Sequence, residues 1–206
     1  MKTVRILGTA GNLPELPETP KGTEVWCCNS PDSYKRFTNL PCSDYTRWFN
    51  LHSRAYIEAT YPSGFKWLQN QDGSRPFYTL KFWPDIPGCV EFPRQQIQET
   101  FAINKVPNRY FTCSVTWLIA FAILEGFERI ELWGFRLRDK PNRGHNCYKF
   151  ERPCFAYWVD QARKRGIEIF YQQEIEELYN AGMMIPGDPN CYLGSLYGYE
   201  TKPEAY

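Results

Sequence analysis

A glycine-containing loop follows the first apolar run of the sequence. The run is Val4–Gly8, and the residues that open and continue the loop are Gly8, Thr9, Ala10, Gly11 and Asn12. Ligands of open parallel sheets bind beyond the carboxyl ends of the strands, where glycines let backbone N–H groups approach a phosphate. The spacing is not Gly-x-Gly-x-x-Gly, and Asn29 rather than an acidic residue follows the second apolar run, which disfavours NAD. A tight turn without a ligand is the alternative interpretation.

Two hydroxyl residues precede the most apolar stretch of the chain. Thr112, Cys113 and Ser114 lead into a run that ends at Leu124 and is followed by Gly126, a typical helix stop. Hydroxyl groups at a helix start cap backbone N–H groups. The same position also presents N–H donors and the positive end of the helix dipole to an anion. Capping and phosphate binding both remain open.

The chain has only two histidines, and each is a candidate general base. His52 ends a predicted strand, so it faces the ligand side of such a sheet. His145 opens a polar segment that also contains Tyr148 and Arg152, and a guanidinium there can clamp a phosphate. A structural histidine and a solvated loop are the alternatives. His145 and Cys147 have no further ligands at zinc spacing, so no metal site is predicted.

These residues need a sheet to position them, and strand and helix patterns alternate along the chain. The predicted strands are residues 4–8, 23–28, 46–51, 77–82, 129–134 and 167–171, with a brief one at 89–92. The predicted helices are residues 64–70, 115–124, 153–165 with Pro153 in the first turn, and 174–180. This alternation predicts a single Rossmann-like α/β domain over residues 1–206, doubly wound, with a mostly parallel sheet and helices on both faces. A polar loop (138–152) and an irregular aromatic tail (183–206) complete it.

Composition excludes several classes of protein. The net charge of +1 disfavours a dedicated nucleic-acid or membrane-surface binder. The longest apolar stretch is about ten residues against roughly 20 for a membrane span, and the N-terminus lacks a secretory pattern. We therefore expect a cytoplasmic protein with reduced cysteines and no membrane partner. P-loop, serine-hydrolase and zinc-protease motifs are absent from the sequence.

Three segments together resemble a known group. ILGTAGN, EVWCCN and FTCSVTWLIAFAILEGFERIELWGFRL are similar to the core of the Rossmann-like 6-hydroxymethylpterin diphosphokinase (MptE-like) and bacterial sialyltransferase group. The resemblance implies that Gly8, Asn12 and Asn29 contact a nucleotide. It also implies that Thr112 and Ser114 bind the donor phosphate and that Tyr148 assists the leaving phosphate. Cys113 and the pair Phe135-Arg136 depart from that pattern.

Most of the chain also resembles uncharacterised tailed-phage proteins of this length, which places it in the host cytoplasm if it is phage-encoded. We expect a transferase of glycosyl or phosphoryl type with a nucleotide or nucleotide-sugar donor and no certain resident cofactor. His52 or His145 would deprotonate the acceptor hydroxyl. The leaving phosphate would be stabilised by Thr112, Ser114, Tyr148 and Arg152. Nucleic acid as acceptor and a homo-oligomer stay open. The alternative is a non-catalytic nucleotide-binding protein, such as a phage counter-defence factor that sequesters a signalling nucleotide.

Aromatic residues are in surplus, with 14 Phe, 14 Tyr and 7 Trp. Six fall in predicted buried elements and are expected in the core: Trp26, Phe49, Phe82, Phe121, Trp133 and Phe170. The C-terminal third holds others that we expect to form a lid or a stacking surface: Tyr148, Tyr157, Trp158, Tyr192, Tyr197 and Tyr199.

Overall fold

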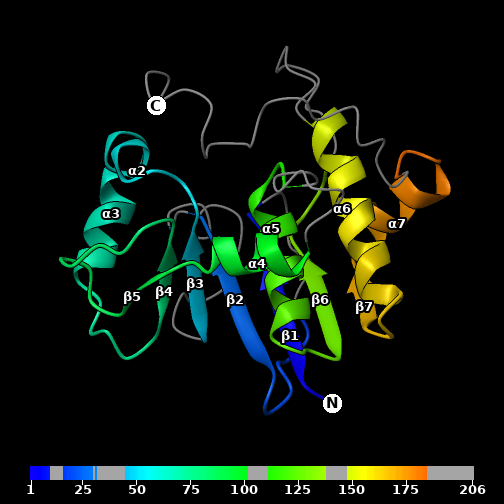
Figure 1. The fold of residues 1–206 in the computed structure, drawn as a ribbon, viewed down its shortest axis with the longest axis horizontal. Coiled ribbons are helices and arrows are strands. Elements are labelled where there is room, and N and C mark those ends of the chain that lie inside the picture. The colour runs from blue at the N-terminus through cyan, green and yellow to red at the C-terminus, as the bar shows by residue number, and fades with distance from the viewer. Residues whose placement is uncertain (10–15, 30, 32–44, 102–110, 138–147, 185–206) are drawn as a thin grey trace.

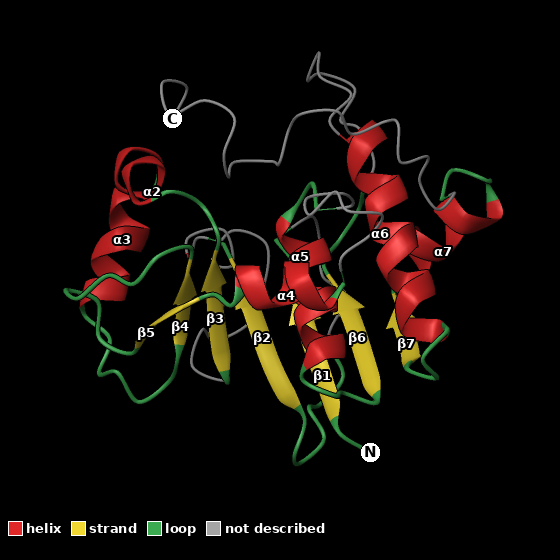
Figure 2. Ribbon diagram, in the orientation of Figure 1, coloured by secondary structure: helices red, strands yellow, loops and turns green. Residues whose placement is uncertain are grey.

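One parallel sheet organises the protein. In the computed structural model, which describes residues 1–9, 16–29, 31, 45–101, 111–137 and 148–184, seven strands lie in the order β5-β4-β3-β2-β1-β6-β7 (Figure 1). They are β1 (Thr3–Leu7), β2 (Glu24–Cys28), β3 (Arg47–Asn50), β4 (Phe77–Thr79), β5 (Cys89–Glu91), β6 (Arg129–Trp133) and β7 (Glu168–Tyr171). Every pairing is parallel, so all carboxyl ends lie at one edge (Figure 2). The predicted α/β fold class is confirmed.

Helices cover both faces of this sheet. The described helices are α2 (Arg54–Thr60), α3 (Pro62–Gln69), α4 (Arg94–Thr100), α5 (Ser114–Leu124), α6 (Tyr148–Arg163) and α7 (Gln173–Asn180). Successive strand residues point to opposite faces. Val4 and Ile6 of β1 join a core with α4–α7, whereas Leu7 joins a second core with α2 and α3. Within the described ranges, no helix is both long and apolar enough to cross a membrane.

The strand order places a topological switch point between β1 and β6. The chain builds β1 to β5 outward on one side and then adds β6 and β7 on the other side of β1. The segments that leave β1 and β6 therefore start side by side, because Leu7 pairs with Trp133 at the strand ends. Such a point opens a crevice beyond the carboxyl ends of the strands.

Helix α5 is the most buried element of the fold. All its residues from Ser114 to Ile123 are buried, as expected of a helix that is apolar on every side. It precedes β6 and runs antiparallel to it, so the α5 N-terminus lies at the carboxyl edge. Gly126, with φ of +72°, ends it as predicted. The sequence signal and the tertiary environment agree here.

Some local predictions are wrong. Tyr148–Arg152 belong to α6 rather than to the polar loop, and Pro153 lies inside that helix rather than in its first turn. The added turn is held by a tertiary contact, in which Arg152 Nη1 donates to the Leu137 carbonyl at 3.0 Å. Helices α2 and α4 had no clear sequence signal. The strand predicted over 77–82 ends at Thr79. Residues 138–147 and 185–206, and with them most of the predicted loop and tail, lie outside the described residues.

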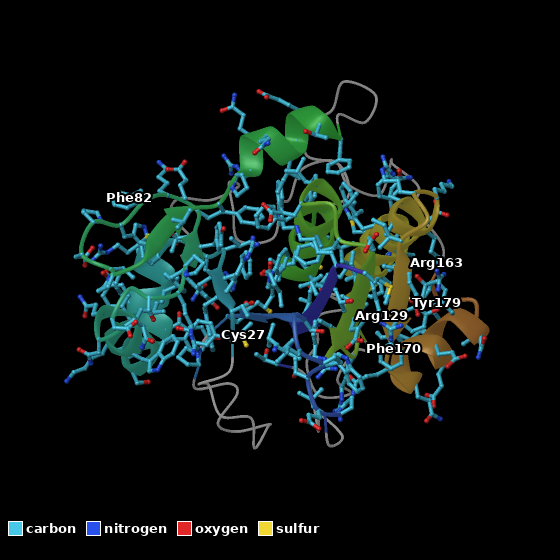
Figure 3. All side chains as sticks on the ribbon, turned by 90° about the horizontal axis from the view of Figure 1, so that it is seen from below. Cys27, Phe82, Arg129, Arg163, Phe170 and Tyr179 are labelled. Atoms are coloured by element: carbon cyan, nitrogen blue, oxygen red, sulfur yellow. The ribbon has the colours of Figure 1, made fainter. Side chains whose placement is uncertain are left out.

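Several aromatic residues also depart from expectation. Trp26, Phe49, Phe121 and Trp133 are buried as predicted, but Phe82 and Phe170 are 59% and 36% exposed, at opposite ends of the sheet (Figure 3). Phe82 follows the end of β4, and Phe170 lies on the outermost strand, β7, where the face is only partly covered. Trp158 is fully buried against Phe111 and Phe101, so it cannot belong to a lid.

A buried ion pair joins the two central strands. Arg5 Nε lies 2.8 Å from Glu131 Oε2, and both side chains are less than 10% exposed. Arg129 Nε and Trp133 Nε1 also donate to the Glu131 carboxylate, while Arg5 Nη1 donates to the Pro17 carbonyl. Burial alone would raise the pKa of Glu131, but these donors, Arg5 first, hold it below its ordinary value of 4.5. The pair therefore favours the folded state when Glu131 is ionised.

We expect Arg5→Met to lower the free energy of unfolding by about 3 kcal/mol, because it leaves the Glu131 charge buried with weaker partners. Urea unfolding at pH 7 measures this. Since the folded pKa of Glu131 is depressed, its stabilisation is present above pH 4.5 and is lost as the pH falls through the folded value. Arg129→Met is the matched control and should cost less than about 1 kcal/mol, because Arg129 is more exposed. Equal losses in both variants would contradict the prediction.

Candidate functional site

The predicted site residues that the structure describes all lie at the carboxyl edge of the sheet, the upper edge in Figure 1. They follow β1, β2 and β3, precede or begin α5, or lie in the first two turns of α6: Gly8, Thr9, Asn29, His52, Thr112, Ser114, Tyr148 and Arg152. The remaining candidates lie outside the described residues: Ala10, Gly11, Asn12 and His145. Tyr148 begins α6, and only its backbone is described.

Gly8 is required by close packing at the switch point. A Cβ atom on Gly8 would lie 2.4 Å from the Gly134 carbonyl oxygen and 2.6 Å from the Phe135 ring. The Gly8 N–H donates to the Trp133 carbonyl at 2.7 Å, which extends the ladder between β1 and β6. Gly8 thus lets the two exit segments touch, and its own N–H is already used within the protein rather than offered to a phosphate.

The segment after β6 has an uncommon backbone. Gly134 and Leu137 have φ of +71° and +49°, and Leu137 is one of two non-glycine residues with positive φ in the described chain. A leucine in this conformation costs about 1–2 kcal/mol. The segment is held by side chains at both ends: Gln172 Oε1 accepts the Gly134 N–H at 2.6 Å, and Arg152 donates to the Leu137 carbonyl.

Asn29 has the other positive φ, +71°, directly after β2. Asparagine tolerates this conformation better than most residues. Its N–H donates to the Phe49 carbonyl, and its own carbonyl accepts from Trp48 Nε1 at 2.9 Å. Because the backbone of Asn29 is engaged with β3, a contact with a ligand would have to come from its half-buried side-chain amide.

The start of α5 differs from the predicted hydroxyl cap. Cys113 is the N-cap residue, with extended backbone, and its side chain makes no capping hydrogen bond. Thr112 and Ser114 flank it and are 7% and 8% exposed. Burial, together with the nearby Glu151 carboxylate, raises the pKa of the Cys113 thiol well above its ordinary value. The thiol therefore stays protonated and is a poor nucleophile, whereas the flanking hydroxyls and the helix dipole suit an anion.

His52 lies at the end of β3 in an apolar setting. Its imidazole is 8% exposed and packs on the Tyr56 ring, with 4.9 Å between ring centroids. Burial lowers its pKa to about 4, so it is neutral near pH 7 but only weakly basic. Strands β1 and β3 are separated by β2, which places them about 10 Å apart at the usual strand spacing. His52 therefore lies to one side of the switch point.

The sequence did not identify Gln172, Gly134 or Leu137 as site residues. Gly134 had a local signal, because it is a glycine at the end of the strand predicted over residues 129–134. Gln172 had none, because its contact with Gly134 spans 38 residues of sequence. In the portion of the chain that the structure describes, no group of three or more His, Cys, Asp or Glu side chains is arranged to hold a metal ion.

Solved structures with a similar fold are bacterial sialyltransferases. The sialyltransferase CstII from Campylobacter jejuni in complex with cytidine-5'-monophosphate has a TM-score of 0.57 and 16% identity, covering 100% of this chain and 95% of that one. The monofunctional alpha-2,3-sialyltransferase Cst-I of the same organism has a TM-score of 0.55 and 15% identity, with coverages of 100% and 86%.

CST-II in complex with a trisaccharide acceptor and CMP has a TM-score of 0.55 and 16% identity, covering 99% of this chain and 96% of that one. No protein-family model and no curated protein matches the sequence. At these identities the likeness concerns the fold, and it supports a sialyltransferase-type Rossmann-like architecture over the length of the chain.

We expect Gly8→Ala to lower the free energy of unfolding by about 2 kcal/mol, because the new Cβ forces the Gly134 carbonyl and the Phe135 ring to move. Thermal and urea unfolding measure the loss. Gly22→Ala is the control. The φ of Gly22, +88°, disfavours a side chain, but no atom lies within 4 Å of the position that its Cβ would take. Near-ultraviolet circular dichroism should change at Gly8→Ala and not at Gly22→Ala, and identical spectra would contradict the packing argument.

The His52 imidazole should stay neutral until the pH approaches 4. The unfolded chain binds a proton near pH 6.5, so the contribution of His52 to stability is present above that value and is lost between about pH 6.5 and 4, by about 3 kcal/mol. Proton NMR of the two histidines measures the titration, with His52→Gln assigning the signal. The same variant should flatten the stability profile in this range, and a His52 signal that titrates near pH 6.5 would show the prediction to be wrong.

Proposed function

We propose that the protein is a nucleotide-sugar-dependent glycosyltransferase whose donor binds at the switch point between β1 and β6. The observation that carries the proposal is the close approach of Gly8 and Gly134 at the sheet edge where α5 also begins, in a fold similar to sialyltransferases solved with CMP; the N-cap residue of α5, Cys113, makes no side-chain capping hydrogen bond. In open parallel sheets this is where nucleotide ligands bind.

The start of α5 suits the donor phosphate. Ser114 is the first residue of the eleven-residue helix α5 and Thr112 lies two residues before it; both are buried hydroxyl residues at the N-terminus, where the helix dipole stabilises negative charge. Glycosyl transfer leaves a nucleotide whose phosphate gains charge as the glycosidic bond breaks. Hydroxyl and N–H donors held in place before the reaction stabilise that charge without reorganisation.

Helix α6 would supply the next groups. Arg152 Nη1 donates to the Leu137 carbonyl at 3.0 Å, which fixes the guanidinium near the segment after β6, and a planar guanidinium suits a phosphate. Tyr148, one turn earlier, would assist the leaving phosphate. Both residues start the helix that packs against α5 at the carboxyl edge, which supports their assignment to the donor site.

Of the two histidines, His52 is poorly suited to act as the general base. The low pKa of His52 makes it a weak base for an acceptor hydroxyl, and its place beside β3 suits acceptor binding or a structural role better. We assign the base to His145, which precedes α6 in the sequence. The acceptor is a hydroxyl of a saccharide or of a nucleic acid, and a phage origin of the chain rests on the sequence resemblance.

A non-catalytic nucleotide-binding protein is the second candidate function. The observation that favours it is the same low basicity of His52. This candidate uses the same crevice and donor contacts but needs no base and no acceptor.

Isothermal titration with CMP, UDP and GDP, followed by release of nucleotide from the corresponding nucleotide-sugars, tests the proposal. We expect binding of one nucleotide and slow hydrolysis of its sugar donor. Thr112→Val should weaken nucleotide binding about tenfold through the loss of one hydrogen bond to phosphate. Thr23→Val, the same change at the opposite edge of the sheet, should leave binding unchanged.

His145→Ala should abolish turnover and preserve binding. Binding without turnover in the unchanged chain would favour the non-catalytic candidate. Absence of binding to all three nucleotides at millimolar concentration would overturn both.

A further inference from the structure

A buried glutamine links the far edge of the sheet to the switch point. Gln172 lies directly after β7 and is 9% exposed, and its Oε1 accepts the Gly134 N–H at 2.6 Å. We propose that Gln172 is a positioning residue of the nucleotide site, which fixes the segment Gly134–Leu137 as one wall of the crevice. The effect on nucleotide binding rests on the proposed function, whereas the fixing of the segment rests on the hydrogen bond between Gln172 and Gly134.

The backbone of Gln172 is itself well anchored. Gln172 precedes α7, and its carbonyl accepts the Ile175 N–H at 2.9 Å in the first turn of that helix. Ile175 is fully buried in the larger core. The side chain therefore extends from a rigid junction between strand and helix, and the acceptor it offers has a defined position.

The segment that it holds does not adopt its conformation by local preference. Leu137 has a left-handed backbone, which leucine avoids, and the segment is tied at one end by Gln172 and at the other by Arg152. An unfavourable conformation persists only when its surroundings determine it. Gln172, directly after β7, and Arg152, in α6, hold the segment in this conformation through their hydrogen bonds.

The wall has little freedom because Gly8 lies directly against it. The Gly134 oxygen and the Phe135 ring already occupy the space that a side chain at position 8 would take. Loss of the Gln172 acceptor would leave the buried Gly134 N–H to seek another partner. The segment would then shift, and the geometry of the crevice beside the β1 exit would change with it.

The role requires an acceptor of the right length, which defines the variants. Gln172→Glu keeps an oxygen at the same reach and places a negative charge at the start of α7, where the helix dipole favours it. Gln172→Leu removes the acceptor at similar volume. Gln172→Asn keeps the amide but shortens the side chain, and it serves if the leucine variant does not fold. Gln173→Leu is the matched control, since Gln173 is an exposed neighbour on α7.

Two measurements on the full chain test the proposal. Hydrogen–deuterium exchange of peptides covering residues 133–137 reports the wall without any ligand, and CMP affinity from titration reports the site. In Gln172→Leu or Gln172→Asn we expect exchange of the Gly134 amide to rise about tenfold and the Kd for CMP to rise about tenfold, as loss of one buried hydrogen bond implies. Gln172→Glu should restore both to within about threefold of the unchanged chain, and Gln173→Leu should alter neither.

Unchanged exchange at Gly134 in the leucine and asparagine variants would overturn the proposal. Faster exchange with unchanged CMP affinity would show that Gln172 is purely structural, and this result would also overturn the proposal. A Gln172→Glu variant with the same exchange and affinity as Gln172→Leu would overturn it as well. If the unchanged chain does not bind CMP, the donor assignment fails, while the exchange data still decide whether Gln172 holds the wall.

Discussion

The contact between Gly8 and Gly134 is the constraint on which the site depends. Parallel pairing of β1 with β6 brings the two exit segments together, and only a residue without a side chain lets them touch. The buried pair of Arg5 and Glu131 ties the same two strands within the sheet. The strand order makes this the switch point of the sheet, the kind of place where ligands of open parallel sheets bind.

Helix α5 places hydroxyl residues at the same edge of the sheet. Its apolar surface is buried on all sides, so the helix cannot rotate or slide without loss of core packing. Thr112 and Ser114 are consequently held at the carboxyl edge together with the positive end of the helix dipole. The same core that stabilises the fold thus fixes the position of these two hydroxyl residues.

Elements that depend on contacts between residues close in sequence were predicted correctly, and elements that depend on distant contacts were not. The central strands and α5 were predicted closely, because a short β-branched run and an apolar run stopped by glycine are local signals. The first turn of α6 was missed because Arg152 and Leu137 stabilise it across 15 residues. Phe82 and Phe170 were placed in the core because they fall in predicted strands, but Phe82 lies beyond the end of β4 and Phe170 lies on the edge strand β7.

The sequence by itself determined the parallel α/β class, the loop after β1 and the hydroxyl residues before α5, since these depend on periodicity and on residue types close in the chain. Tertiary structure alone decided which candidates meet. In the folded protein the Gly8 N–H donates to a strand carbonyl, and Gln172 accepts the Gly134 N–H. The His52 imidazole is buried two strand spacings away from β1. The physical reason is that strand order and burial arise from packing across the whole chain, which no short segment encodes.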